Sequence, residues 1–348
     1  MNVGLIGCGR VALFHICTYA HIPEANVVAI SDIDLKKAKA FAQKYGIKNV
    51  FEDYSELFEV KDLDFVDVCT PTSTHPKIAC EAAKYGHNIL LEKPMARSTL
   101  DCDEIINEVS KHGVKLCVCH NQLFTPGVEQ AKSIVDSGEF ELASFRVSVK
   151  ENAEHIGAPS WVMTPEQGGL LWETGCHSAY LQLHFLKEIN EVLAIGSKVK
   201  HSLHDHFVAL LGTSNQAIGV IEISWLARRP EVLFEFMSFD GKRMQILDHD
   251  YFLEIPEEVP QSFIKGFYSD QKALIKKWKK TVMESLRKRT LLSCLHHHNL
   301  ITKYMQSIKD DSDPPVKPED GRKTIKLLEC IEESLEKNHS VKIKSLIH

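Results

Sequence analysis

A glycine-rich turn near the start of the chain constrains its fold more than any other feature. Gly7, Gly9 and Ala12 stand in the order Gly-x-Gly-x-x-Ala, directly after the apolar stretch Asn2–Ile6 and directly before a stretch with helical spacing. The first glycine allows a tight turn, the second lets the backbone approach a pyrophosphate, and the small third residue permits close packing of helix on strand. The pattern therefore predicts a βαβ unit that binds a dinucleotide.

Residues around this turn extend the expectation. Arg10 and Val11 open the helix, where unpaired backbone N–H groups favour phosphate charge. Asp32 closes the second predicted strand, where a carboxylate accepts hydrogen bonds from ribose hydroxyls. This carboxylate would repel a 2′-phosphate, so NAD is favoured over NADP. Lys36 and Lys37 follow closely and keep NADP as the less favoured alternative.

The first 120 residues alternate apolar stretches with helical patterns. The apolar stretches mostly lack period-two alternation, which is typical of strands buried on both faces of a parallel sheet. Strands are predicted at Asn2–Ile6, Val27–Ser31, Phe65–Cys69, Asn88–Leu91 and Lys115–Cys119, and helices at Leu35–Tyr45, Pro76–Tyr85 and Ser98–Lys111. The alternation predicts an α/β fold with a doubly wound Rossmann domain over residues 1–121.

After about residue 122 the pattern changes to strands that follow one another through short turns. The expected strands are Phe140–Val149, Val192–Lys200, Phe207–Thr213, Ala217–Ser224, Leu233–Ser238, Arg243–Leu247 and Tyr251–Glu254. Such a series favours a mostly antiparallel sheet. Residues 122–348 are therefore expected to form an α+β domain with one large open sheet. Its last helix, about 318–337, could pack back on the first domain.

Composition and charge exclude several function classes. The 348 residues carry a formal charge of −6, whereas general nucleic-acid binding needs a basic face. No apolar stretch approaches the roughly 18 residues of a membrane helix, and the start has no signal-peptide layout, so a cytoplasmic location is expected. The ten cysteines are interpreted as buried thiols. A basic stretch, 271–289, is interpreted as a surface helix, with a subunit contact, an anionic substrate or a membrane surface as alternatives.

Two short motifs follow neighbouring strands of the predicted parallel sheet. Thr70-Pro71 and His75 follow one strand, and Glu92-Lys93-Pro94 follows the next one along the chain. Ligands bind beyond the carboxyl ends of the strands in open α/β sheets. Both motifs are therefore expected at the cofactor edge, although an exposed surface lysine is the usual state of this residue type.

Glu173 and His177 form a third candidate group. If one helix carries both, their spacing of four places them on one face, where a carboxylate orients an imidazole and raises its basicity. A partly buried core histidine is the alternative. One histidine and one carboxylate are too few ligands for a metal site, and so is the Cys117 and Cys119 pair. The side chains of His296-His297-His298 would point in different directions on a helix, so no metal is predicted.

These motifs together resemble the Gfo/Idh/MocA oxidoreductases. The resemblance spans nearly the whole chain and rests on the glycine turn, Asp32, Thr70-Pro71 with His75, Glu92-Lys93-Pro94, the cluster of Glu173, Gly175 and His177, and the Pro318–Lys323 entry into the last helix. It implies a Rossmann domain and a C-terminal domain whose open sheet faces the cofactor. It also implies NAD(P)-dependent oxidation or reduction of a sugar, inositol, nucleotide sugar or related polyol.

The resemblance further implies roles for individual residues. Lys93 would hydrogen-bond the reacting oxygen, and His177 would act as the acid or base, with Glu173 as a third catalytic residue. Expected at the cofactor are Gly7, Gly9, Arg10, Val11, Asp32, Thr70, Pro71, His75, Glu92, Lys93 and Asn121. Expected at the substrate are Lys93, Asn121, Trp161, His177 and Tyr180.

The chain departs from the family pattern at three positions. Glu173 and Tyr180 stand where the family often has Asp, and Val162 stands where it often has Arg. The last two changes leave the substrate open. Two further functions stay as alternatives: a glycosidase that oxidises its substrate transiently with NAD, and a cofactor-binding regulator without turnover, against which the lysine–histidine pair argues. The exposed face of a large sheet makes a homodimer or homotetramer the expected assembly.

Overall fold

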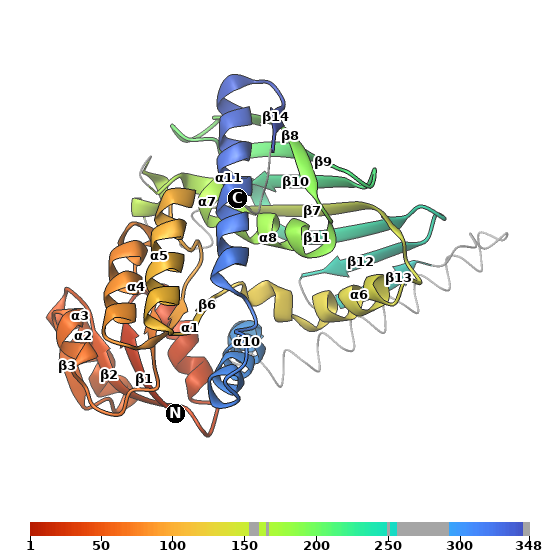
Figure 1. Cartoon of the computed structure of the whole chain (residues 1–348). Helices are drawn as coiled ribbons and strands as arrows, with labels where there is room; N and C mark the ends of the chain where they lie inside the picture. Colours follow the sequence, from red (N-terminus) through yellow and green to blue (C-terminus); the bar gives the residue numbers. More distant parts are fainter. Residues whose placement is uncertain (153–159, 165–166, 249–250, 256–291, 344–348) are drawn as a thin grey trace.

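Two sheets form the frame of the molecule, as the computed structural model in Figure 1 shows. The structure describes residues 1–152, 160–164, 167–248, 251–255 and 292–343. The predicted basic helix at 271–289 lies outside these residues. Among the described helices, none combines the length and the apolar character needed to cross a membrane. The cytoplasmic location and the lack of a nucleic-acid partner stay predictions.

The first sheet is parallel and six-stranded, in the order β3-β2-β1-β4-β5-β6. Its strands are β1 (Asn2–Ile6), β2 (Asn26–Ser31), β3 (Asn49–Phe51), β4 (Phe65–Val68), β5 (Asn88–Leu91) and β6 (Leu116–Val118). Helices α1 (Arg10–Tyr19), α2 (Leu35–Tyr45), α3 (Tyr54–Phe58), α4 (His75–Lys84) and α5 (Thr99–His112) connect them. The strand order reverses between β1 and β4, which is where such sheets bind dinucleotides. The predicted Rossmann fold is confirmed; β3 and α3 were not predicted, because three and five residues are too few for a periodic pattern.

The second sheet has eight strands, in the order β13-β12-β11-β7-β10-β9-β8-β14, and is mostly antiparallel as predicted. Only β7 and β10 pair in parallel among these neighbours. The strands are β7 (Leu142–Asn152), β8 (Ile189–Ser197), β9 (His206–Thr213), β10 (Ile218–Ser224), β11 (Leu226–Ser238), β12 (Arg243–Leu247), β13 (Tyr251–Ile255) and β14 (Val341–Lys342). Helix α8 (Gly175–Phe185) packs on one face through β7 and β10, and on the other face the described part of the chain leaves apolar side chains such as Ile195 exposed.

Short helices lead from one sheet to the other. The chain leaves β6 through η2 (Asn121–Phe124) and α6 (Pro126–Asp136), and the turn η3 (Ser160–Met163) and α7 (Gly169–Glu173) precede α8. Helices α7 and α8 lie over the carboxyl ends of the parallel strands. Glu173 of α7 accepts a hydrogen bond from Lys93, which follows β5, and Tyr180 of α8 accepts one from Gln122, which follows β6.

The two C-terminal helices fasten the sheets together. Helix α10 (Leu292–Lys309) packs on α1, and α11 (Pro318–Lys337) packs on α5 and β6 as well as on α8 and β8. A side chain at Gly321 would place its Cβ 2.8 Å from Val118, so only glycine allows α11 to approach β6 this closely. Charge adds to this packing, because Arg322 forms an ion pair with Asp103 on α5.

The cysteines follow the prediction at most described positions. Eight of them are free and buried: Cys8, Cys69, Cys80, Cys102, Cys117, Cys119, Cys176 and Cys330. For Cys17 the prediction of a thiol is wrong, because this residue is disulfide-bonded. A sequence that lacks a dense cysteine framework therefore does not exclude a single bridge.

Candidate active site

The glycine turn has the geometry that a dinucleotide phosphate needs. Gly7 has a φ of +94°, and a Cβ there would lie 2.6 Å from the carbonyl oxygen of Cys69, so this position requires glycine. Gly9 caps the N-terminus of α1, and a Cβ there would meet only that same oxygen, 4.0 Å away. The space in front of Arg10 and Val11, the first residues of α1, is therefore open to a pyrophosphate.

The carboxylate of Asp32 lies beside this turn. The backbone N–H of Cys8 donates to Asp32 Oδ2 over 2.7 Å, and the N–H of Asp34 donates to Oδ1 over 2.9 Å. This places the acid at the end of β2, where ribose hydroxyls would lie. Lys37 Nζ lies 3.3 Å from Oδ2, so a cation also stands near the ribose position.

Lys93 is a buried cation at the end of β5. Its side chain is 10% exposed, and its Nζ lies 3.2 Å from Glu173 Oε2 and donates to the backbone oxygen of Glu173 over 3.0 Å. Burial opposes the charged form, but the Glu173 carboxylate outweighs it and the pKa of Lys93 is raised above its ordinary value. The lysine therefore keeps its proton, and the alternative of a solvated surface lysine does not apply.

Two residues predicted at the cofactor edge turn inward. The His75 ring is buried, with Nδ1 2.9 Å from the oxygen of Pro94 and Nε2 3.0 Å from the oxygen of Thr70, and burial lowers its pKa. The His75 ring thus links the loops that follow β4 and β5 by hydrogen bonds. Thr70 and Pro71 are at least partly exposed to solvent. The Glu92 carboxylate is also buried and lies 2.9 Å from His15 Nε2.

Glu173 and His177 are placed differently from the prediction. Glu173 ends α7, His177 lies in α8, and the two helices meet at Thr174, so the condition that one helix carries both residues is not met. Glu173 pairs with Lys93, as described above, and His177 Nδ1 lies 2.7 Å from the phenol oxygen of Tyr180. The group that orients His177 is therefore a phenol on the next helical turn.

Tyr180 connects α8 to the segment after β6. Its phenol oxygen accepts the backbone N–H of Gln122 over 3.2 Å and donates to Asn121 Oδ1 over 3.4 Å. Asn121 is itself buried, and its side chain contacts Tyr180. Trp161 belongs to η3, and its side chain lies outside the described part of the structure.

One residue at this edge was missed by the sequence analysis. Glu151, near the end of β7, has a pKa raised by burial and by the neighbouring Glu173 carboxylate, while Lys93 and Arg10 lower it. Because such charges act only at short range, Glu151 lies near Glu173, Lys93 and Arg10. No motif marks it in the sequence, since an acid at the polar end of a strand is common.

A glycine turn, an acid at the end of β2, and a lysine and a histidine at the same sheet edge together define a nicotinamide-dependent dehydrogenase. Residues 1–120 match the oxidoreductase family with an NAD-binding Rossmann fold, and residues 128–246 match the GFO/IDH/MocA C-terminal domain. The chain belongs to the Gfo/Idh/MocA family of oxidoreductases, and NAD is the cofactor of its Rossmann domain.

Individual relatives agree with this membership. The uncharacterized oxidoreductase YrbE of Bacillus subtilis is 30% identical over 64% of this chain and 66% of its own length. The myo-inositol 2-dehydrogenase of Thermotoga maritima is 25% identical over 100% of both chains. The crystal structure of the WlbA dehydrogenase from Bordetella pertussis, in complex with NADH and UDP-GlcNAcA, is similar with a TM-score of 0.82 at 21% identity, covering 99% of this chain and 98% of that one.

Proposed function

We propose that this dehydrogenase oxidises a secondary hydroxyl of a neutral cyclitol or sugar ring, with Lys93 and His177 as its catalytic residues. The observation that carries the proposal is the largely buried Lys93 ammonium at the end of β5, which is held by Glu173 at the end of α7, while His177 stands in the first turn of the next helix, α8. A regulator without turnover would not need a largely buried cation at the cofactor edge of the sheet.

The described residues fit NAD. The turn at Gly7 and Gly9 leaves space for the pyrophosphate, and Asp32 would accept hydrogen bonds from the ribose hydroxyls. When bound, the nicotinamide supplies the hydride chemistry. Lys93 would donate to the reacting oxygen and stabilise the negative charge that develops on it, an interaction that is strong where water is excluded.

His177 would take up the hydroxyl proton. Histidine is the side chain whose intrinsic pKa lies closest to neutrality, which suits a base that must release its proton again in the reverse reaction. The phenol of Tyr180 holds Nδ1, so Nε2 is the nitrogen that would exchange the proton. Glu173 would keep Lys93 charged and in place.

The charges of the cleft favour a neutral substrate. Glu173 and Glu151 present two carboxylates, which accept hydrogen bonds from hydroxyl groups and repel phosphates and sugar acids. Two described cations act on these acids: Lys93 is already paired with Glu173, and Arg10 at the start of α1 acts on Glu151. The relative from Thermotoga maritima, which matches over its full length, is by name a dehydrogenase of the neutral ring myo-inositol.

NADH absorbance would test the proposal on a panel of inositols, neutral sugars, sugar acids and nucleotide sugars, each with NAD or NADP. We expect NADH from at least one neutral ring, with kcat/KM about tenfold or more above the best anionic compound, since a like charge in the cleft costs at least about 1.4 kcal/mol. Turnover of anionic compounds alone would refute the neutral substrate. Glycoside cleavage without net NADH would identify the glycosidase, and calorimetry without binding of either cofactor would refute the NAD site.

The open face of the second sheet supports a homodimer or homotetramer. Leu193, Ile195, Leu210 and Ile218 are exposed there, Ile195 by 66%, and the register places Leu193 opposite Leu210. A second copy would bury this row. We expect Ile195→Glu to reduce the molar mass in light scattering to that of a smaller assembly, whereas Leu100→Glu, at an exposed leucine on α5, should leave it unchanged. A monomeric wild-type chain would refute the proposal.

A further inference from the structure

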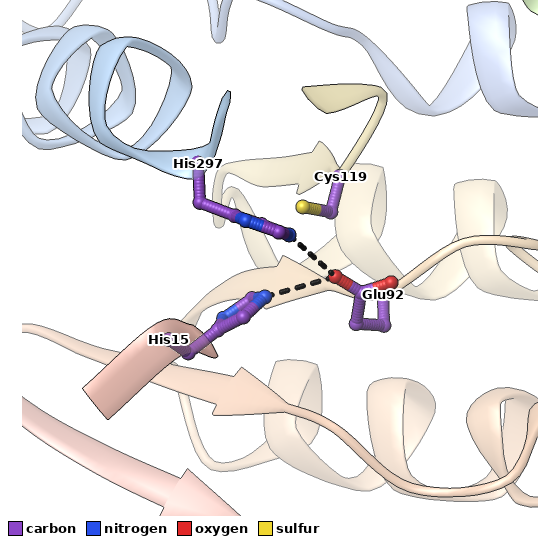
Figure 2. Close-up of side chains that lie close together, drawn as sticks. All are labelled: His15, Glu92, Cys119 and His297. Atoms are coloured by element: carbon purple, nitrogen blue, oxygen red, sulfur yellow. Dashed lines mark hydrogen bonds and ion pairs between the residues drawn. The ribbon is translucent and has the colours of Figure 1, made fainter. Parts of the chain in front are cut away.

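Four buried side chains from four elements converge beneath the cofactor edge (Figure 2). His15 comes from α1, Glu92 follows β5, Cys119 follows β6 and His297 comes from α10. One potential ligand atom of each lies within 4.8 Å of all the others. Glu92 Oε1 is 2.9 Å from His15 Nε2 and 3.9 Å from His297 Nε2. Lys93, His177 and Glu173, the residues proposed for the hydride chemistry, do not belong to this group. Glu92 is the sequence neighbour of Lys93.

These donors are the set that zinc prefers. Two imidazoles, a thiolate and a carboxylate satisfy a tetrahedral zinc ion, whose bonds of about 2.0 to 2.3 Å place neighbouring ligand atoms roughly 3.3 to 3.7 Å apart. The spacing in the cluster brackets this range, so inward movements of about 1 Å or less per side chain would complete the site. All four positions would be filled by protein, which is the mark of a structural zinc site rather than a catalytic one.

The two histidines already present the required nitrogens. His15 Nδ1 lies 2.7 Å from Asp67 Oδ2, and this carboxylate also accepts from the hydroxyl of Tyr19 over 2.7 Å. A carboxylate on Nδ1 fixes the tautomer and leaves Nε2 to the metal, as in metal-bound histidines. The amide of Asn121 lies 3.1 Å from His297 Nε2, so that nitrogen carries a lone pair, and metal binding would replace this hydrogen bond.

We propose that His15, Glu92, Cys119 and His297 bind one divalent transition metal ion, zinc in the first place. Binding would release one proton from His15 Nε2 and one from the Cys119 thiol as the divalent ion enters, so the formal charge of the buried cluster would not change. The ion would join α10 to α1, β5 and β6. Its role is therefore to hold α10 on the Rossmann domain.

Metal analysis of the purified full-length chain tests the proposal, with zinc and then Co²⁺ as probes. We expect one ion per chain and, for Co²⁺, a thiolate charge-transfer band together with the strong visible bands of tetrahedral coordination. Cys119→Ser should abolish the charge-transfer band, and both it and His297→Gln should weaken metal binding at least tenfold. Cys117→Ser, two residues before Cys119, and His298→Gln, next to His297 on α10, are the matched controls, and they should retain the ion.

Two outcomes would overturn the proposal. One is a wild-type chain that binds less than a stoichiometric amount of either ion; the other is Co²⁺ binding whose spectrum Cys119→Ser does not change. Calorimetric NAD binding by each variant serves as the check of folding that does not depend on the metal. Zinc should also raise the Tm of the wild type but not that of a folded Cys119→Ser variant.

Discussion

Replacing Lys93 by alanine is expected to lower kcat/KM by about 10²- to 10³-fold, the usual effect of removing one group that stabilises a developing oxyanion. The Lys93 side chain is only 10% exposed and its ammonium is paired with Glu173, so a water molecule would not replace the lost positive charge in the variant. The affinity for NAD should change little, because the pyrophosphate and ribose contacts lie at the glycine turn and Asp32. Steady-state kinetics on the substrate found in the panel, with calorimetry for NAD, measure both quantities.

A second lysine serves as the control for this substitution. Lys39→Ala, at an exposed position on α2, should leave both quantities unchanged. Lys93→Ala also leaves the Glu173 carboxylate without its partner, so the variant should be checked for folding by circular dichroism. Unchanged turnover, or a folded variant that no longer binds NAD, would contradict the role assigned to Lys93.

The fold could be predicted where a local pattern carries it. The bounds of β1, β5 and α2 agree with the predicted ranges, because buried parallel strands are unbroken apolar stretches and Gly46 ends α2 with a φ of +73°. The two-residue strand β14 could not be predicted, since only its pairing with β8 makes it a strand. The length of an element, rather than its residue types, therefore decides whether the sequence predicts it.

The site was predictable only where residues lie close in sequence or follow a strand end. Motifs alone lead to Lys93 and His177 as candidates, and the contact of Tyr180 with His177 could not be predicted, although the departure of Tyr180 from the family pattern was visible. The metal-type cluster shows the limit most clearly. His297 stands in a run of three histidines and Cys119 in a Cys-Val-Cys stretch, and each run alone lacks ligands. Only the pairing of β5 with β6 and the return of α10 bring them together.

Tyr180 places a neutral phenol next to the proposed base, His177, where the family often has a charged carboxylate. A carboxylate at this position, which the family often has, would favour the imidazolium form of His177 strongly. The phenol oxygen accepts the same Nδ1–H hydrogen bond without a negative charge. His177 should therefore be oriented as firmly as with an acid but remain a weaker base, which suits release of the proton near neutral pH.

Replacing His177 by asparagine is expected to lower kcat by about 10²- to 10⁴-fold, the range for loss of a general base. In the wild type, kcat/KM for oxidation should rise with pH as the base loses its proton, and this acidic limb should be absent from the variant. The phenol oxygen of Tyr180 accepts the Nδ1–H hydrogen bond and so favours the protonated ring of His177, and Tyr180→Phe removes this acceptor. Its acidic limb should therefore move to lower pH, with a loss in kcat of about tenfold.

The pH profiles separate a catalytic from a merely structural role. His339→Asn, at an exposed histidine beyond α11, should keep both the wild-type rate and the acidic limb. A structural role for His177 would lower the amount of active enzyme without removing the limb, because the remaining molecules would titrate as before. Retention of the acidic limb in His177→Asn would therefore exclude this histidine as the base. A limb that stays in place in Tyr180→Phe would show that the phenol does not set its basicity.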